Sequence, residues 1–327
     1  MIKWLKYIFW TGMTLGGVYI FLKFVRPFGF GAWDAYTVFQ KCVIWPLQSI
    51  FQKTLLAPYI YLALGFTLLL ECLIPVNPKQ KLFSDSFFQD FVWFFYETIL
   101  NAIVITVYVD SLRWVYTTYF SFLTIKNMSL WPYWVRFALG VLLLDFLYWL
   151  QHYINHKVYW FWEFHTIHHS QKEINFFTDF RYHIFEYIVR QTILVIPFLI
   201  FAIHTPTVVV FSIVSTWYTR FYHGNVRTNL GPLRYVLVTP QSHRIHHSRL
   251  IQHKDQNFGS LFCIWDQIFK TQYQGYSEYP ETGIEDAAFP HEQKIQLLKS
   301  LFMPLMQMAY PVVKLTHKVQ DFWRNKG

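Results

Sequence analysis

Long apolar segments constrain the fold of this 327-residue chain more than any other feature. Four of them, at about residues 7–25, 58–75, 91–109 and 134–150, approach the roughly 20 residues that a helix needs to cross a bilayer. A further stretch, residues 188–218, is interrupted by two prolines and can form one crossing or a hairpin. The first segment lacks a small-residue cleavage site, so we interpret it as a retained membrane anchor.

The composition also favours contact with lipid. Charged residues make up 14% of the chain, against about 25% in soluble domains. Aromatic residues reach 21%, and Trp and Tyr gather at membrane interfaces; the alternative is a soluble domain with an unusually aromatic core. The net charge of +9 is dispersed, which favours anionic lipid over nucleic acid as the partner. The three cysteines are isolated and predict neither a disulfide framework nor a zinc ribbon.

Acidic residues inside these segments are costly in lipid and should face protein or a cavity. We interpret Glu71 and Glu97 as helix-end or interfacial residues. Asp145 lies seven residues before His152, which places both on one helical face. Asp145 is therefore a candidate to support a site built around that histidine.

The distribution of basic residues indicates orientation, because Lys and Arg mark cytoplasmic loops. The chain after residue 150 is rich in both, so we expect that part to be cytoplasmic. The basic residues between 23 and 53 oppose this orientation, and a re-entrant segment near residues 33–50 would reconcile them. Residues 291–327 alternate apolar and basic patches, which predicts an amphipathic helix on the membrane surface or one packed on the catalytic part.

Histidines are the second unusual feature, because most of the 14 occur in clusters. Spacings of i, i+3 and i+4 predict that the imidazoles of each cluster share one helical face. Eight imidazoles exceed the four ligands of one tetrahedral zinc, so we expect two metals. Imidazole suits iron, zinc, copper and nickel alike. The three clusters are His152 and His156; His165, His168 and His169; and His243, His246 and His247.

The order and surroundings of these clusters resemble the fatty acid hydroxylase and sterol desaturase superfamily. Residues 160–170 (WFWEFHTIHHS) look like its central box, and residues 175–186 (NFFTDFRYHIFE) look like the segment that follows. Residues 239–248 (TPQSHRIHHS) are similar to its last box, and residues 257–266 are similar to the segment after it. The resemblance covers roughly residues 140–275.

The resemblance implies an all-α integral membrane protein with four to six membrane-embedded helices and a cytosolic helical cap that carries a histidine-rich di-metal site. It implies two irons that activate dioxygen. The ligands carried over from the family are the eight clustered histidines, and His223 falls where relatives often add one. Ligating imidazoles usually donate their other N–H to an oxygen, and the candidates for such supporting roles are Asp145, Asp179, His183, Glu186, His253, Asp255 and Asp266.

The resemblance divides the chain into membrane segments at 1–130, a catalytic domain at 131–275 and a basic amphipathic tail at 276–327.

Oxygen activation needs two external electrons. Gly29 and Gly31 do not form a dinucleotide fingerprint, so we expect a separate donor, a ferredoxin or a membrane cytochrome with its reductase. We expect no nucleic-acid partner.

The predicted function is hydroxylation or desaturation of a membrane lipid: a sterol or isoprenoid, a fatty acyl chain or an alkylglycerol. The expected location is a multi-pass membrane protein with a cytoplasmic catalytic face. Three alternatives stay open: an alkane hydroxylase or acyl desaturase of the related histidine-box family, a histidine-rich metal transporter, and a zinc-dependent membrane hydrolase.

Overall fold

The computed structural model describes residues 58–125, 128, 130–203, 205–291 and 297–324. Within these ranges every regular element is a helix, with three isolated β-bridges and no strand. The helical class predicted from the apolar segments is therefore confirmed for the described chain. The predicted anchor at 7–25 and the proposed re-entrant segment at 33–50 lie outside the described residues, as do Gly29 and Gly31.

The first described helices arise from two of the apolar segments. The side chain of Ser84 accepts a hydrogen bond from the backbone N–H of Phe87, which satisfies one of the amides left free where a helix begins. The helix that starts there continues directly into a π-helix and a further α-helix. The elements are α4 (Pro58–Leu73), α5 (Asp85–Ile103), the π-helix η4 (Val104–Val109) and α6 (Asp110–Val115).

Helices α7 (Tyr133–Lys157) and α8 (Tyr159–His169) carry the first two histidine clusters. The predicted continuation of the fourth apolar segment into His152 and His156 is confirmed by α7. A single residue, Val158, separates the two helices with extended backbone angles of φ −95° and ψ 114°. This break turns the chain sharply, so the end of α7 and the length of α8 can face the same space.

The segment at 188–218 folds as two helices, α9 (Ile184–Ile200) and α10 (Thr205–Tyr222). Pro206 lies in the first turn of α10, where a helix tolerates proline because no intrahelical N–H is needed there. The hairpin alternative therefore describes this stretch better than a single continuous helix.

The third cluster begins on α11 (Pro240–His246), a short and well-capped helix, and ends at its C-cap residue His247. Thr239 and Ser242 bond reciprocally at its start, and Pro240 occupies the first turn, two features that stabilise a helix beginning. The remaining elements are the π-helix η5 (Tyr116–Phe120), the short 3-10 helices η6 (Ser121–Leu123), η8 (Thr178–Phe180), η9 (Gly231–Tyr235) and η10 (Ile251–His253), and the α-helices α12 (Ile264–Ile268) and α13 (Leu297–Arg324).

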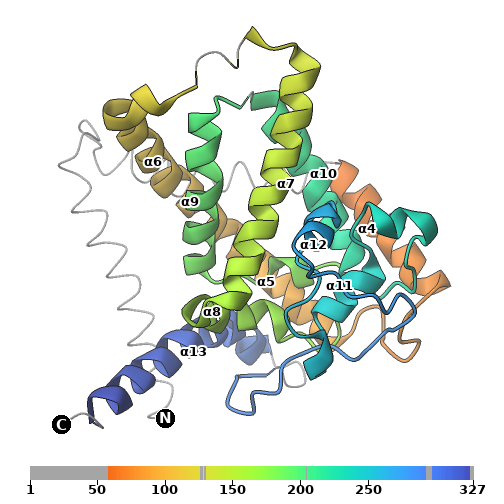
Figure 1. Cartoon of the computed structure of the whole chain (residues 1–327). Helices are drawn as coiled ribbons and strands as arrows, with labels where there is room; N and C mark the ends of the chain where they lie inside the picture. Colours follow the sequence, from red (N-terminus) through yellow and green to blue (C-terminus); the bar gives the residue numbers. More distant parts are fainter. Residues whose placement is uncertain (1–57, 126–127, 129, 204, 292–296, 325–327) are drawn as a thin grey trace.

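Helix α7 forms the axis of the molecule and packs against α8, α9 and α10 (Figure 1). Helix α13 packs across α5 and α8, with Met303, Ala309 and Leu315 buried. This contact matches the alternative in which the tail packs on the catalytic part, although α13 still exposes Leu298 and Phe302. A membrane-surface role for this exposed side stays a prediction.

One helix in the described ranges, α7, is long and apolar enough to cross a membrane by length and composition. Only 28% of its apolar window is buried inside the protein, whereas the core helix of a soluble domain would be mostly covered. The predicted number of four to six membrane helices stays a prediction.

Candidate metal centre

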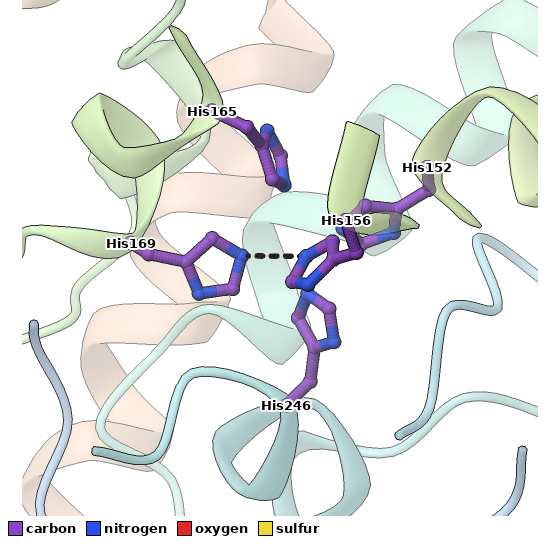
Figure 2. A group of neighbouring side chains, drawn as sticks. All are labelled: His152, His156, His165, His169 and His246. Carbon is purple, nitrogen blue, oxygen red and sulfur yellow. Dashed lines mark hydrogen bonds between the residues drawn. The ribbon is translucent and has the colours of Figure 1, made fainter. Parts of the chain in front are cut away.

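The structure gathers nine histidines into two neighbouring groups whose ring nitrogens lie within 4.8 Å of one another in each group. Group A, drawn in Figure 2, takes two imidazoles from α7, two from α8 and one from α11. Group B takes residues from α8 and α11 and from the turn after α10. Group A is His152, His156, His165, His169 and His246, and group B is His168, His223, His243 and His247.

The two triple clusters are each divided between the groups. His165 and His169 join group A while His168 joins group B, and the third cluster is split in the same way. Consecutive residues on an α-helix point about 100° apart because one turn takes 3.6 residues. The prediction that each triple shares one face was therefore wrong: the i and i+4 members share a face, and the i+3 member points to the other group.

Facing nitrogens lie at short distances in both groups. The Nε2 atoms of His156 and His169 are 3.1 Å apart (Figure 2). In group B, Nε2 of His243 lies 2.8 Å from that of His223 and 3.1 Å from that of His247. Metal–imidazole bonds of about 2.0–2.1 Å place neighbouring ligand atoms roughly 3 to 3.5 Å apart. The spacing of these donors therefore fits a metal ion at the centre of each group.

The outward nitrogens of group A are held by oxygens. Nδ1 of His165 lies 2.7 Å from the Glu186 carboxylate, and Nδ1 of His152 donates to the carbonyl of Phe258 at 3.1 Å. The Nε2 atoms of both rings are buried with no hydrogen-bond partner among the described residues. A ligating imidazole has this arrangement, with one nitrogen fixed by an acceptor and the other directed at the metal.

Burial keeps these imidazoles neutral. Desolvation lowers the pKa of His246 to about 3, although its bond to the Gln256 carbonyl opposes the shift. Desolvation and then the neighbouring His247 lower the pKa of His169 well below its usual value. In group B, desolvation lowers the pKa of His223 to about 4. A metal binds only the deprotonated ring, so the fold supplies the form of histidine that coordination needs.

Two of the predicted supporting residues contact the histidine groups. Glu186 is buried and is shared by His165 and by Asn155, whose side-chain amide donates to it at 2.8 Å. Asp255 lies 3.6 Å from Nδ1 of His156 and accepts from Lys157 at 2.7 Å. Asn155 was not singled out from the sequence, although its place between the two histidines of the first cluster was a usable signal.

Asp145 and Asp266 bond to the chain after the third cluster and not to a histidine. Asp145 accepts from the backbone N–H of Leu261 and from the Trp265 indole. Asp266 accepts from the backbone N–H of Phe258, whose carbonyl orients His152. Asp266 therefore acts one step further from the site than predicted.

The other three candidates lie apart from the groups. His183 accepts from the backbone N–H of Phe185 and so caps α9. His253 bonds to Ser248 and to Glu278. Asp179 accepts from Thr219 at 3.2 Å and lines a cavity beside group B.

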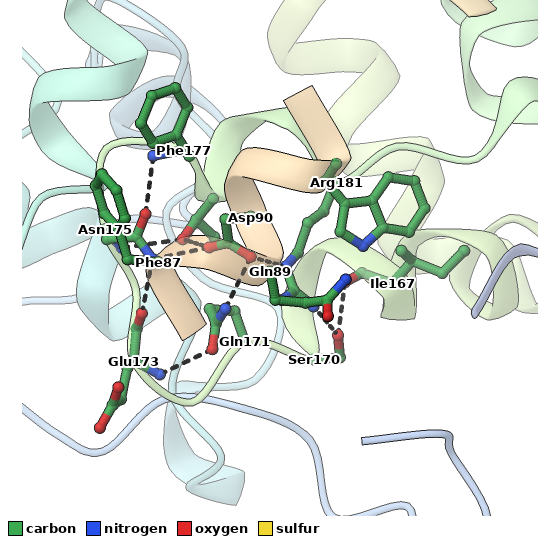
Figure 3. A network of polar contacts seen from close by, with 12 residues as sticks. Phe87, Gln89, Asp90, Ile167, Ser170, Gln171, Glu173, Asn175, Phe177 and Arg181 are labelled. Atoms are coloured by element: carbon green, nitrogen blue, oxygen red, sulfur yellow. Dashed lines mark hydrogen bonds and ion pairs between the residues drawn. The ribbon is translucent and has the colours of Figure 1, made fainter. Parts of the chain in front are cut away.

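A buried network around Asp90 was missed from the sequence (Figure 3). Asp90 on α5 is fully buried and accepts from Gln171, Thr178 and Arg181 at 2.5–2.8 Å. Arg181 also donates to the Ser170 hydroxyl at 3.1 Å. The network fixes the chain that leaves the second cluster to a helix more than 80 residues earlier. In the sequence, Asp90 stands beside an apolar segment and Arg181 follows a histidine box, and both positions could have indicated buried charges. Their pairing depends on tertiary structure.

A cavity of about 470 Å³ lies beside the histidines. Its wall includes members of both groups: His152, His165, His168, His223 and His243. Glu97 also lines it and accepts a bond from the Tyr187 hydroxyl, so Glu97 is not the helix-end residue that we expected. A second cavity of about 200 Å³ is lined by three other histidines of group A: His156, His169 and His246.

Comparisons with known proteins agree with this arrangement. Residues 137–271 match the fatty acid hydroxylase family, within the predicted catalytic domain; the predicted division of the chain stays a prediction. An ornithine lipid hydroxylase of Rhizobium tropici is 28% identical over 141 residues, which are 43% of this chain and 43% of the relative. No solved structure matches this chain.

Two further relatives are alkylglycerol monooxygenases. That of Danio rerio is 29% identical over 214 residues, 64% of this chain and 45% of the relative. That of Homo sapiens is 34% identical over 143 residues, 42% of this chain and 30% of the relative. The chain thus spans less than half the length of each curated relative. The family match over residues 137–271 and these relatives support the resemblance to the fatty acid hydroxylase and sterol desaturase superfamily.

Proposed function

We propose that this protein is an O2-dependent di-iron oxygenase that hydroxylates a C–H bond of a membrane lipid. The observation that carries this proposal is the pair of buried histidine groups on the wall of a 470 Å³ cavity. The relatives are named as lipid hydroxylases and alkylglycerol monooxygenases, which supports hydroxylation over desaturation and over metal transport.

The protein's own residues would prepare the site in three ways. Glu186 and the carbonyl of Phe258 fix the rings of His165 and His152 in group A, which keeps the ligand nitrogens directed inward. Burial excludes water and keeps the imidazoles neutral. When bound, two irons would supply the activation of dioxygen, with two electrons taken from outside the chain.

The electrons would come from a separate protein, a ferredoxin or a membrane cytochrome with its reductase. The second cavity supports this proposal, because its group A histidines are not those that line the large cavity, and Arg249, Leu250 and Lys254 also border it. An external donor could thus approach one side of the metals while a lipid occupies the other.

Exposed apolar surface supports a multi-pass membrane location with the catalytic face in the cytoplasm. On α4, Leu62 and Leu73 are 70% and 66% exposed. On α10, Val209 and Val214 are 50% and 46% exposed. Lipid would cover these exposed apolar side chains.

Metal analysis and a lipid oxidation assay test the proposal. The purified chain should hold about two irons and oxidise lipid only with dioxygen and an added electron donor. His168→Ala removes a nitrogen of group B, so activity should fall by more than about 100-fold while the melting temperature of the metal-free protein changes little.

His291→Ala is the matched control, because His291 lies outside both groups, and it should keep its activity. Full activity in His168→Ala would contradict the ligand assignment. Tight binding of zinc alone, with metal flux into vesicles and no lipid oxidation, would support a transporter instead.

A further inference from the structure

Two short segments on either side of the third histidine cluster join into one structural unit. The backbone N–H of Cys263 donates to the Val236 carbonyl at 3.0 Å, and that of Val238 donates to the Leu261 carbonyl at 3.1 Å. Helix η9 and the residues after it therefore lie beside α12 and the residues before it. We call residues 231–238 and 261–270 together the η9–α12 unit.

The outer side of the η9–α12 unit is apolar. Leu233 on η9 and Ile268 on α12 are 54% and 57% exposed. Single exposed apolar residues are ordinary on proteins, but here six large ones occur on two adjoining segments. Such a grouping marks a surface that contacts a membrane or another protein. The six residues are Leu233, Tyr235, Val236, Ile264, Ile268 and Phe269.

The inner side of the unit packs against the middle of α7 and of α10. Leu261 forms a buried cluster with Leu144 of α7 and Phe211 of α10, and Leu237 and Phe262 pack on this cluster. Leu144 lies at the centre of α7, whose 25 residues span about 37 Å, against about 30 Å for the hydrocarbon core of a bilayer. If α7 crosses the membrane, the unit therefore lies at the depth of the hydrocarbon and not in the cytoplasm.

The hydrogen bonds of the unit suit that depth. Irregular backbone can lie at membrane depth only where the protein itself satisfies its polar groups. Asp145 of α7 is fully buried and accepts from the backbone N–H of Leu261 at 2.9 Å and of Phe262 at 3.3 Å. Its carboxylate also accepts from the Trp265 indole at 2.8 Å. This acid in an apolar helix thus replaces water as the acceptor for the turn that leads into α12.

Cationic and aromatic side chains accompany the apolar surface. The Arg234 guanidinium lies 4.9 Å from the ring centroids of both Tyr235 and Tyr276. Lys270 directly follows α12 and is exposed. Tyrosine is enriched at the level of the lipid headgroups, and Lys and Arg attract the anionic lipid of the cytoplasmic leaflet. This chemistry and the depth along α7 both favour lipid over a protein as the phase that covers the unit.

The unit is also joined to the metal centre. Asp266 of α12 accepts from the backbone N–H of Phe258 and of Gly259. The carbonyl of Phe258 orients His152, and Gly259 lines the large cavity. The element with the exposed apolar surface is therefore bonded to the wall of the cavity and to the chain that holds a histidine of group A.

We propose that the η9–α12 unit is embedded in the cytoplasmic leaflet beside α7 and α10, with its six exposed apolar side chains in contact with lipid acyl chains. The inference rests on the membrane location proposed above. It goes beyond that location by naming the part of the catalytic region that enters the bilayer. The histidine groups then lie at the membrane boundary, next to an embedded unit, and not in a cap held above the bilayer.

Fluorescence quenching of the full-length protein in lipid vesicles tests the inference. With Cys42 and Cys72 replaced by serine and the buried Cys263 retained, Ile268→Cys is labelled with a polarity-sensitive fluorophore. Lipids that carry a nitroxide on the acyl chain should quench this probe at least about threefold more strongly than a probe at Ile251→Cys, because only the first position lies at the depth of the hydrocarbon core. Aqueous iodide should show the opposite preference.

Ile251→Cys is the matched control, because it replaces the same residue type at a position that is 81% exposed and borders the second cavity. Leu233→Cys is an independent second position on η9, with the same expectation as Ile268→Cys. Each labelled variant should bind as much iron as the unlabelled parent, which shows that the label has not disrupted the histidine groups.

Two results would overturn the inference. Strong quenching by iodide at both Ile268→Cys and Leu233→Cys would show that the unit faces water. Protection of both probes from iodide and from the lipid nitroxide would show that protein covers the unit, either a second copy of this chain or another protein. Neither measurement involves turnover. If both probes contact lipid and the iron-loaded protein oxidises no lipid, the oxygenase proposal fails and the embedded unit stands.

Discussion

At the scale of single residues, the histidine groups depend on the oxygens that hold their outer nitrogens. Glu186 serves His165 in this way and is itself fixed by Asn155. Oxygens in such positions orient the ring and raise its basicity, and their loss typically lowers metal affinity about 10- to 100-fold.

Glu186→Ala should therefore weaken iron binding by about 10- to 100-fold, and Glu186→Gln should weaken it less, because its amide oxygen can still accept from His165. Titration of the metal-free protein with iron(II), followed by equilibrium dialysis, gives both values. Glu285→Gln is the control, since Glu285 lies at the second cavity and is not a member of either group. Equal affinities in all three variants would show that Glu186 has no role in orientation.

At the scale of secondary-structure elements, the Asp90 network joins α5 to the chain after α8 (Figure 3). This segment begins one residue after His169. The position of the second cluster is therefore coupled to α5. This helix precedes residues 137–271, the part of the chain that matches the family.

Asp90→Asn removes the charge that faces Arg181 in a fully buried pair, and breaking such a pair typically costs about 3–5 kcal/mol. The loss should appear as a lower free energy of unfolding in chemical denaturation of the detergent-solubilised protein. Asp85→Asn, at an exposed site in the first turn of α5, should cost no more than about 1 kcal/mol. Similar losses in the two variants would refute the structural role of the network.

At the scale of the whole molecule, α7 (Figure 1) begins at Tyr133 and carries two histidines of group A, His152 and His156, near its C-terminal end. If α7 crosses the bilayer, residues beyond its two ends must lie on opposite sides of the membrane. Leu130 is 80% exposed before α7, and the Glu281 side chain, which pairs with Arg249 after the third cluster, is 76% exposed.

Cysteine labelling in sealed vesicles measures this topology. With Cys42 and Cys72 replaced by serine, an impermeant thiol reagent should label Glu281→Cys only from the cytoplasmic side and Leu130→Cys only from the other side. Labelling of both positions from one side would show that α7 does not cross the membrane.

Much of the fold and of the site follows from local sequence. The apolar segments predicted α4, α5 and α7 because a helix needs only a run of suitable neighbours. The spacing of His152 and His156 predicted two nitrogens on one helical side, and both join group A. The resemblance added His223, and the structure brings it into group B.

Tertiary structure alone decided how these parts meet. Helix geometry separates His168 from His169 by about 100° around α8, but the sequence could not show that distant helices place a second histidine group on the His168 side. It could not pair Asp90 with Arg181 or direct Asp145 to the backbone of Leu261, since these partners are about 90 and 116 residues apart. Local spacing determines which side of a helix a residue occupies, whereas the packing of distant helices determines what that side faces. For this protein, local spacing placed the histidine donors on their helices. Packing of the helices then formed the cavity beside these donors.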